Sequence, residues 1–286
     1  MIQEAHIGIG IQGREGGQAA LASDYVIGQF RFLEKLILVH GHWSYYRTSY
    51  MVLAFLSKSW IWALTSFWLQ AESSLQVVVL YEYFFIVFFN LLFTALPPFS
   101  LGIFDQNLSQ TVIEKFPQIY KIGIKQHFST AKVFAVFFAE SIYCSVAAYF
   151  IFGHDYVLYD GQSIPQSYLG TTTATGVIIF INLHIGFLMH RWTILSGAAF
   201  YITAIGTVLL LIILNFFPEG YGLFMLPLIM VKDCVFWLSL MLFLVVGLLP
   251  RVAWRTWCII VSPSDHDILL EGQHVETKKS AVSPII

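Results

Sequence analysis

A lysine stands in the middle of an apolar stretch that is long enough to cross a membrane. Residues 50–70 read YMVLAFLSKSWIWALTSFWLQ, and Lys58 is the one charged residue among them. A full charge near the centre of a bilayer costs about 3 kcal/mol on insertion scales, so an ionisable residue there is by default a hypothesis for a functional site. Counted from Arg47, Lys58 lies about 16 Å along a helix. That depth is too great for easy snorkelling, and the compact ammonium of lysine is suited to meeting a phosphate or carboxylate.

Polar residues accompany this lysine. Ser57 and Ser59 flank it directly, which makes the helix locally polar and open to bending or hydration. Asn90, in FFNLLFTALPP, is a second candidate, although a buried amide can equally form a hydrogen bond to a neighbouring helix. His40 and His42, in VHGHW, have no third or fourth ligand nearby, so no metal site is expected.

The composition indicates whether these residues lie in water or in a lipid bilayer. Of the 286 residues, 57% are hydrophobic, 17% aromatic and only 11% charged, whereas soluble domains carry about 25% charged residues. About 20 apolar residues are needed to cross a bilayer as a helix. The sequence therefore predicts an all-α membrane protein, a six-helix transmembrane bundle, in which Pro97 and Pro98 end the second span. The six expected spans are roughly 48–69, 75–97, 131–152, 171–190, 193–215 and 233–250.

Basic residues predict the orientation. Lys and Arg are concentrated before the first span, between the second and third, between the fourth and fifth, and after the sixth. Among these are Arg14, Arg31, Lys35, Arg47, Lys115, Lys121, Lys125, Lys132, Arg191, Arg251, Arg255, Lys278 and Lys279. Only Lys58 and Lys232 fall outside the pattern, so the positive-inside rule predicts that both termini are cytosolic.

The first 47 residues are of a different kind. HIGIGI predicts a short buried strand, QGREGG a turn and EGGQAALASDYV an Ala-rich helix. Gly8, Gly10 and Gly13 spell GxGxxG, but this pattern is weak alone and no second strand is expected to follow it. A tight strand-to-helix turn in the remnant of an α/β domain is the favoured interpretation.

Longer stretches resemble one family. The segment MIQEAHIGIGIQGREGGQAALASDYVIGQFRFLEKLILVHGHWSYYR is similar to the end of the phosphorylation domain of P4-type ATPases, the phospholipid flippases, where it runs into the fifth transmembrane helix. FNLLFTALPPFSLGIFDQNLS resembles the region of the sixth family helix, INLHIGFLMHRWT that of the eighth, and FWLSLMLFLVVGLLPR the tenth.

The resemblance implies a domain organisation. Residues 1–47 would be the C-terminal remnant of a haloacid dehalogenase-like phosphorylation domain with its link to the membrane. Residues 48–257 would be the six-helix transmembrane domain, similar to flippase helices five to ten. Residues 258–286 would be a cytosolic tail, which its composition predicts to be disordered.

The resemblance also implies a function, namely the C-terminal membrane half of an ATP-driven flippase, with a pathway for an aminophospholipid-like headgroup toward the cytosolic leaflet. Lys58 matches a lysine of the fifth helix beside that pathway, and Asn90 matches an asparagine of the sixth. Ser57 and Ser59 would be neighbours, although the family usually has Asn where Ser59 stands. An accessory two-span β-subunit is the implied partner, nucleic acid is not, and the implied locations are eukaryotic plasma membrane or trans-Golgi and endosomal membranes.

Mg²⁺ and ATP are implied for the full-length family enzyme. The present sequence contains neither a DKTG motif nor a GDGAND motif. Phosphoryl transfer needs a positioned phosphate, metal and nucleophile. No catalytic residue, metal ligand or ATP turnover is therefore expected of this chain alone.

Two alternatives remain open. The chain could be a catalytically inactive truncated product or a regulatory binding partner of a full-length flippase. It could also be a self-contained secondary transporter or channel, but spans one to three show no internal repeat of spans four to six.

Overall fold

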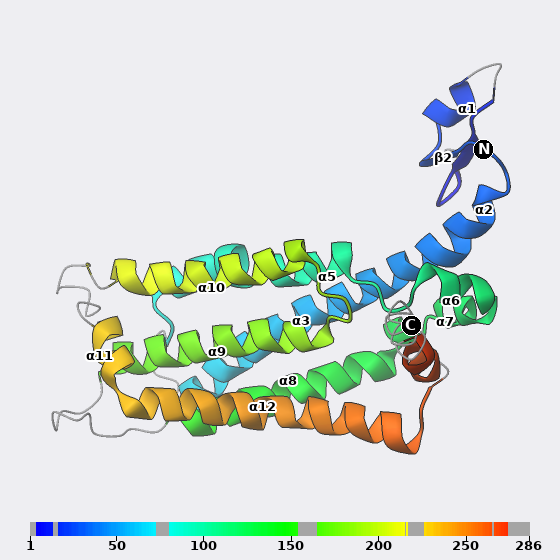
Figure 1. Ribbon diagram of the computed structural model, residues 1–286. Helices are drawn as coiled ribbons and strands as arrows, with labels where there is room; N and C mark the ends of the chain where they lie inside the picture. The colour runs from blue at the N-terminus through cyan, green and yellow to red at the C-terminus, as the bar shows by residue number, and fades with distance from the viewer. Residues whose placement is uncertain are drawn as a thin grey trace, which may run out of the picture. The chain divides into compact units, whose positions relative to one another are not determined.

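The protein is described by a computed structural model covering residues 4–13, 17–72, 80–153, 165–214, 216, 226–264 and 266–273. The chain divides into two compact units. The membrane unit comprises Arg47–Gln106 and Phe128–Asp267, and the smaller unit comprises Met1–Tyr46, Asn107–His127 and Ile268–Ile286. Figure 1 shows the ribbons of both units.

The smaller unit contains a two-stranded parallel sheet, which corrects the expectation of a single strand. Strand β1 (Ile9–Ile11) pairs with β2 (Tyr25–Ile27), and the short helix α1 (Gln18–Leu21) lies between them in the chain. The second strand is the run Tyr-Val-Ile, whose β-branched and aromatic side chains favour strands. Its three residues are too few to show the alternating pattern by which a strand is recognised in a sequence.

Gly10 is where the strand and helix α1 approach each other closely. A Cβ atom at this position would lie 2.5 Å from Ser23 Oγ and 2.8 Å from the carbonyl oxygen of Ala19. The backbone N–H of Gly8 donates a hydrogen bond of 2.7 Å to Asp24 Oδ2. The close approach accounts for Gly10 by local packing, as the strand-to-helix interpretation expects.

A second part of the smaller unit has its own apolar cluster. This part of the unit is made of α2 (Phe32–Lys35), the π-helix η2 (Leu36–Gly41), α6 (Gln110–Lys115), the 3-10 helix η4 (Pro117–Tyr120) and α7 (Lys121–Ile124). Val39, Leu108 and Ile113 are buried in the cluster, and Leu269 and Leu270 pack against it. These two leucines belong to a helical segment, residues 266–273, that the structure forms where a disordered tail was predicted. Residues 274–286 lie outside the described part of the chain.

In the described part of the chain, six helical segments are long and apolar enough to cross a membrane, which confirms the predicted number and the fold class. They are Phe32–Ala71, Tyr83–Phe104, Ala131–Phe152, Gln166–Leu188, Ile194–Ile213 and Cys234–Val261. The first segment begins with α2 and η2. The other regular elements of the six segments are α3 (His42–Glu72), α4 (Tyr83–Phe88), the π-helix η3 (Phe89–Phe93), α5 (Leu96–Phe104), α8 (Ala131–Phe152), α9 (Gln166–Leu188), α10 (Ile194–Leu214) and α12 (Cys234–Val261). The short helix α11 (Leu226–Lys232) precedes α12.

Helix α9 is the central helix of the membrane unit. In the most apolar 18-residue stretch of α9, 72% is buried inside the structure, whereas the corresponding share is 28% for α10 and 22% for α12. In Figure 1, α9 accordingly runs between α10 on one side and α8 and α12 on the other. Its small residues, including Gly170 and Gly176, let neighbouring segments approach, since a Cβ at Gly170 would lie 2.0 Å from the carbonyl oxygen of Leu80.

The second span is broken, and the two prolines begin a helix here instead of ending one. Pro97 and Pro98 lie in the first turn of α5, where the missing N–H groups of proline cost nothing and its fixed φ suits a helix. The break falls at Thr94, whose φ of −139° and ψ of 7° are not helical. The prediction that the prolines end the span was therefore wrong, and the span continues to Phe104.

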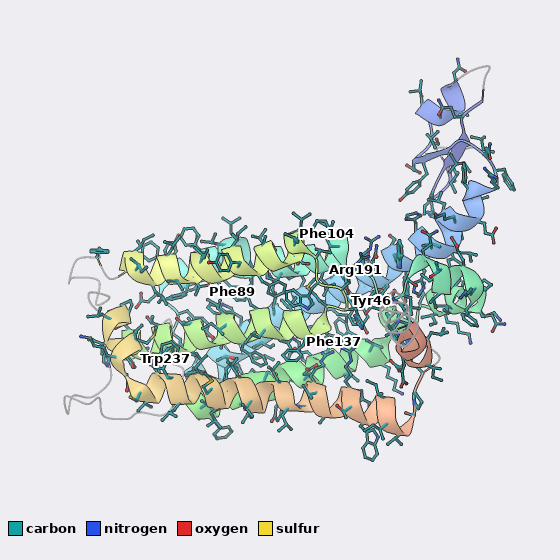
Figure 2. The ribbon with its side chains drawn as sticks, in the orientation of Figure 1. Tyr46, Phe89, Phe104, Phe137, Arg191 and Trp237 are labelled. Carbon is teal, nitrogen blue, oxygen red and sulfur yellow. The ribbon has the colours of Figure 1, made fainter. Side chains whose placement is uncertain are left out.

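Two predicted loops meet at one end of the membrane unit. The fully buried carboxylate of Asp105, directly after α5, accepts hydrogen bonds at its Oδ1 from the backbone N–H groups of His190 (3.0 Å) and Arg191 (2.8 Å). Figure 2 shows Phe104 and Arg191 at this end and Trp237 at the opposite one. The loop after the second span and the short turn between the fourth and fifth spans therefore lie on the same side.

Candidate functional site

Lys58 is buried inside the membrane unit. Its side chain is 1% exposed. Its Nζ donates hydrogen bonds to the carbonyl oxygen of Thr94 (3.0 Å) and to Thr94 Oγ1 (3.1 Å). Thr94 Oγ1 in turn donates to the carbonyl oxygen of Phe89 at 2.6 Å. The lysine of α3 is thus fixed at the break of the second span.

Aromatic rings complete the surroundings of the Lys58 ammonium. Nζ lies 4.4 Å from the ring centroid of Phe55 and 5.7 Å from that of Phe89, and a ring face attracts a cation at such distances. All these partners are neutral. Among the described residues the recorded ion pairs are His184–Glu140, His190–Asp105 and Arg251–Glu140, so Lys58 has no carboxylate partner there.

The two prolines explain why side chains gather at the break. In a continuous helix the N–H groups of residues 97 and 98 would bond to the carbonyls four residues earlier, those of Phe93 and Thr94. Proline has no N–H, so both carbonyls need another donor inside the bilayer. Asn182 Nδ2 of α9 donates to the Phe93 carbonyl at 2.9 Å, and Lys58 Nζ supplies the Thr94 carbonyl.

The other predicted pathway residues divide between two environments. Ser57 is buried at 1% exposure, and its Oγ lies 3.1 Å from Ser141 Oγ of α8. Ser59 is exposed and donates to the carbonyl oxygen of Phe55 in its own helix at 2.9 Å. Asn90 is also exposed. The structure thus brings Lys58 together with Thr94, which the sequence reasoning missed.

Three polar residues at this site were not found from the sequence, namely Thr94, Ser141 and Asn182. The signal for Thr94 was present, because a residue four positions before a proline in a membrane span carries an orphan carbonyl. The same rule marks the carbonyl of Phe93 as needing a donor. It does not say which side chain supplies that donor, so Asn182 had no comparable signal.

A second group of charged residues is paired within the membrane unit. Arg251 Nε donates to Glu140 Oε1 at 2.8 Å, and Arg251 Nη2 contacts Glu140 Oε2. His184 Nε2 lies 3.1 Å from Glu140 Oε1. The Arg251 guanidinium also lies 4.3 Å from the ring centroid of Phe137. Arg251, expected just after the sixth span, therefore lies within α12 and forms a two-point pair with a carboxylate of α8.

Comparisons with known proteins agree with the resemblance noted in the sequence. The family described as "Phospholipid-translocating P-type ATPase C-terminal" matches residues 20–264. Phospholipid-transporting ATPase 1 of Arabidopsis thaliana is 31% identical over 280 residues, which cover 97% of this chain and 24% of the relative. Probable phospholipid-transporting ATPase IM of Homo sapiens is 32% identical over 295 residues, with 97% of this chain and 24% of the relative covered.

A phospholipid-transporting ATPase of Chaetomium thermophilum is 34% identical over 286 residues, which cover 95% of this chain and 18% of the relative. The chain thus spans about a quarter or less of the length of these relatives. The matched region includes both the break at Thr94 and the paired charges of α8 and α12. The chain belongs to the family of phospholipid-translocating P-type ATPases and corresponds to their C-terminal part.

Proposed function

We propose that this chain forms the C-terminal membrane half of an ATP-driven phospholipid flippase, and that Lys58 meets the anionic headgroup as it passes toward the cytosolic leaflet. One contrast carries the proposal. Arg251 is paired with Glu140, whereas Lys58, equally inside the membrane unit, has only neutral partners among the described residues. A buried cation without an anion is costly. The phosphate of a lipid headgroup would supply that anion.

The chemistry of the ammonium group fits this role. It has three N–H donors, and the two hydrogen bonds to Thr94 leave one for an incoming oxygen. A hydrogen bond from an ammonium to a phosphate oxygen is stronger than one to a neutral carbonyl. The headgroup can therefore compete with Thr94 for the lysine. Ser57, Ser59 and Asn90 are proposed as polar neighbours along the pathway, while the lipid tails stay in the bilayer.

The remaining parts of the activity belong to the whole family enzyme. Among the described residues no group of three or more His, Cys, Asp or Glu side chains could hold a metal ion. Mg²⁺ and ATP are proposed as cofactors of the full-length family enzyme on the family resemblance. An accessory two-span β-subunit and a location in plasma membrane or trans-Golgi and endosomal membranes are proposed on the family resemblance.

The function is tested by replacing Lys58 in a full-length protein that carries this chain. We expect Lys58→Ala to weaken lipid-stimulated ATP hydrolysis and labelled-lipid uptake about tenfold or more, the effect of losing one hydrogen bond to a charged group. Phosphorylation from ATP should survive. Lys58→Arg should restore transport only in part, because the wider planar guanidinium must fit the space of an ammonium.

Lys232→Ala is the matched control, since Lys232 is an exposed lysine at the end of α11. It should leave transport and lipid stimulation unchanged. An unaltered lipid dependence in Lys58→Ala would show that Lys58 serves only to satisfy the Thr94 carbonyl, and the headgroup role would be wrong.

The orientation of the chain is a separate proposal, that both termini are cytosolic. It is supported by the one-sided distribution of Lys and Arg. Short epitope tags placed before residue 1 and after residue 286 should both be protected from antibody and protease in sealed cells, and both should become accessible after permeabilisation. Labelling of either tag in sealed cells would contradict this orientation.

A further inference from the structure

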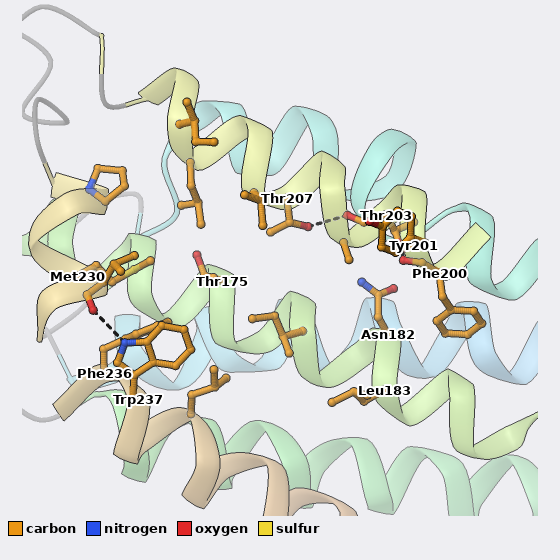
Figure 3. A pocket seen from close by; sticks show the side chains of 18 of the residues that line it. Thr175, Asn182, Leu183, Phe200, Tyr201, Thr203, Thr207, Met230, Phe236 and Trp237 are labelled. Atoms are coloured by element: carbon orange, nitrogen blue, oxygen red, sulfur yellow. Dashed lines mark hydrogen bonds between the residues drawn. The ribbon is translucent and has the colours of Figure 1, made fainter. Parts of the chain in front are cut away.

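A cavity of about 770 Å³ lies between α9, α10, α11 and α12, wholly within the membrane unit. Its volume falls in the range of about 300–1,000 Å³ that is usual for sites binding small molecules. Figure 3 shows side chains of α9 and α10 facing each other across it, with Met230 of α11 and Trp237 of α12 closing one end. Lys58 does not line it, and Asn182 is the residue that the cavity shares with the break of the second span.

The cavity is long and opens at the surface of the membrane unit. Along α10 its lining runs from Gly197 to Ile212, a distance of about 22 Å at the helical rise per residue. Several of its apolar lining side chains are also strongly exposed, including Val208 at 54% and Leu228 at 42%. An occupant would therefore enter from the membrane, and its shape would be elongated and mostly apolar.

The threonine hydroxyl groups of the cavity wall already form hydrogen bonds. Thr175 donates to the carbonyl oxygen of Thr171 at 2.8 Å, and Thr207 donates to that of Thr203 at 3.0 Å. Thr203 donates to the carbonyl oxygen of Phe200 at 2.7 Å. Each of these bonds stays within one helix, so the threonines do not need a polar group from an occupant.

Asn182 is different, because one of its two polar side-chain atoms has no hydrogen-bond partner among the described residues. Its Nδ2 donates to the Phe93 carbonyl at the break of the second span. Its Oδ1 is buried and has no hydrogen-bond partner among the described residues. Figure 3 shows this amide directed toward α10, opposite Thr203. A buried acceptor without a donor costs free energy, so the cavity favours an occupant with one donor at this level.

We propose that the cavity binds a membrane sterol, with its single hydroxyl donating to Asn182 Oδ1. From the level of Thr203 to Ile212 the apolar wall extends about 14 Å, which gives the rigid ring system a place to lie toward α11. A rigid body loses less conformational freedom on binding than a flexible chain. A fatty-acyl chain has no hydroxyl or amine donor, and the ester groups of a phospholipid carry only acceptors, so neither would satisfy Asn182. This binding does not depend on the proposed role of Lys58.

The direct test is photolabelling of the full 286-residue chain in membranes. A sterol carrying a diazirine and an alkyne is crosslinked by light, and the labelled peptides are mapped by mass spectrometry. We expect label on peptides of α9, α10 and α11, displaced by excess unlabelled sterol. A parallel sample receives phosphatidylcholine with a diazirine in its acyl chain, which should label the cavity weakly and should not be displaced by sterol.

Substitutions on α10 and α9 locate the site. Ala204 lines the cavity and Ile205 does not, so Ala204→Trp should abolish sterol labelling of these peptides while Ile205→Trp, equal in final bulk on the same helix, should keep it. Asn182→Leu should lower labelling about fivefold, the effect of one neutral hydrogen bond. Thr207→Val, which removes a hydroxyl already bonded within α10, should leave it unchanged.

The wild-type peptide map decides the proposal even where a variant fails to fold. Absence of sterol label from the cavity peptides would overturn it. Displacement of the label by phospholipid as readily as by sterol would assign the cavity to an acyl chain instead. Full labelling of a well-folded Ala204→Trp or Asn182→Leu chain would place the sterol elsewhere.

Discussion

Replacing either Glu140 or Arg251 alone by leucine should lower the free energy of unfolding of the membrane unit by about 3–5 kcal/mol, because each change leaves one buried charge without its partner. The side chains are only 8% and 18% exposed, respectively, and are joined through both carboxylate oxygens. In Arg251→Leu the Glu140 carboxylate would keep His184 as its one hydrogen-bond partner among the described residues. The measurement is the unfolding of the purified chain in mixed micelles as the fraction of denaturing detergent is raised.

The double variant Glu140→Leu with Arg251→Leu is the matched control. Removing both charges should be nearly neutral, since well-packed apolar residues often replace a buried ion pair without loss of stability. A double variant as unstable as the sum of the two single ones would contradict the pairing. It would show that the two charges act independently of each other.

The second large effect is expected at Asp105. Asp105→Ala should lower the free energy of unfolding by about 3 kcal/mol, because two backbone N–H groups of the short turn between α9 and α10 would lose their acceptor, at about 1–3 kcal/mol for each buried donor left unsatisfied. The thermal midpoint of the purified chain, followed by fluorescence-detected gel filtration, would report the loss.

Asp105→Asn separates the hydrogen bonds from the charge. The amide keeps an oxygen in the position of Oδ1, which accepts both bonds, so we expect this variant to lose less than half as much stability as Asp105→Ala. Equal losses in the two variants would assign the role of Asp105 to its charge beside His190, whose Nδ1 lies 3.6 Å from Oδ2.

The sequence was sufficient for the membrane class and the number of spans, for a physical reason. A spanning helix must satisfy every backbone group internally over about 20 apolar residues, and this requirement is visible locally in the composition. The ends of the spans were less well predicted. The second span was placed at 75–97, but residues 73–79 lie outside the described part and the helical segment runs over Tyr83–Phe104.

The details that depend on packing between distant segments were not predictable in the same way. The strand β2 is recognisable only once β1 lies beside it. The depth of Lys58 could be estimated by counting residues, but its contact with Thr94 joins positions 36 residues apart, and that of Asn182 with Phe93 joins positions 89 apart. Counting N–H donors around the prolines shows that two carbonyls need partners, whereas the helix arrangement decides which side chains serve them.

The break at Thr94 has a mechanical consequence for the second span. Because Pro97 and Pro98 donate no backbone bond, the carbonyls on one side of the break are held by the side chains of Lys58 and Asn182 instead of by the helix itself. Side chains follow small rotations of the backbone by changing rotamer, which the hydrogen-bond ladder of a continuous helix does not allow. A small rotation between the half formed by α4 and η3 and the half formed by α5 would therefore not require a helix hydrogen bond of these two carbonyls to break. The second span thus consists of two helical halves that meet at Thr94. The side chains of Lys58 and Asn182 hold the backbone carbonyls at this point.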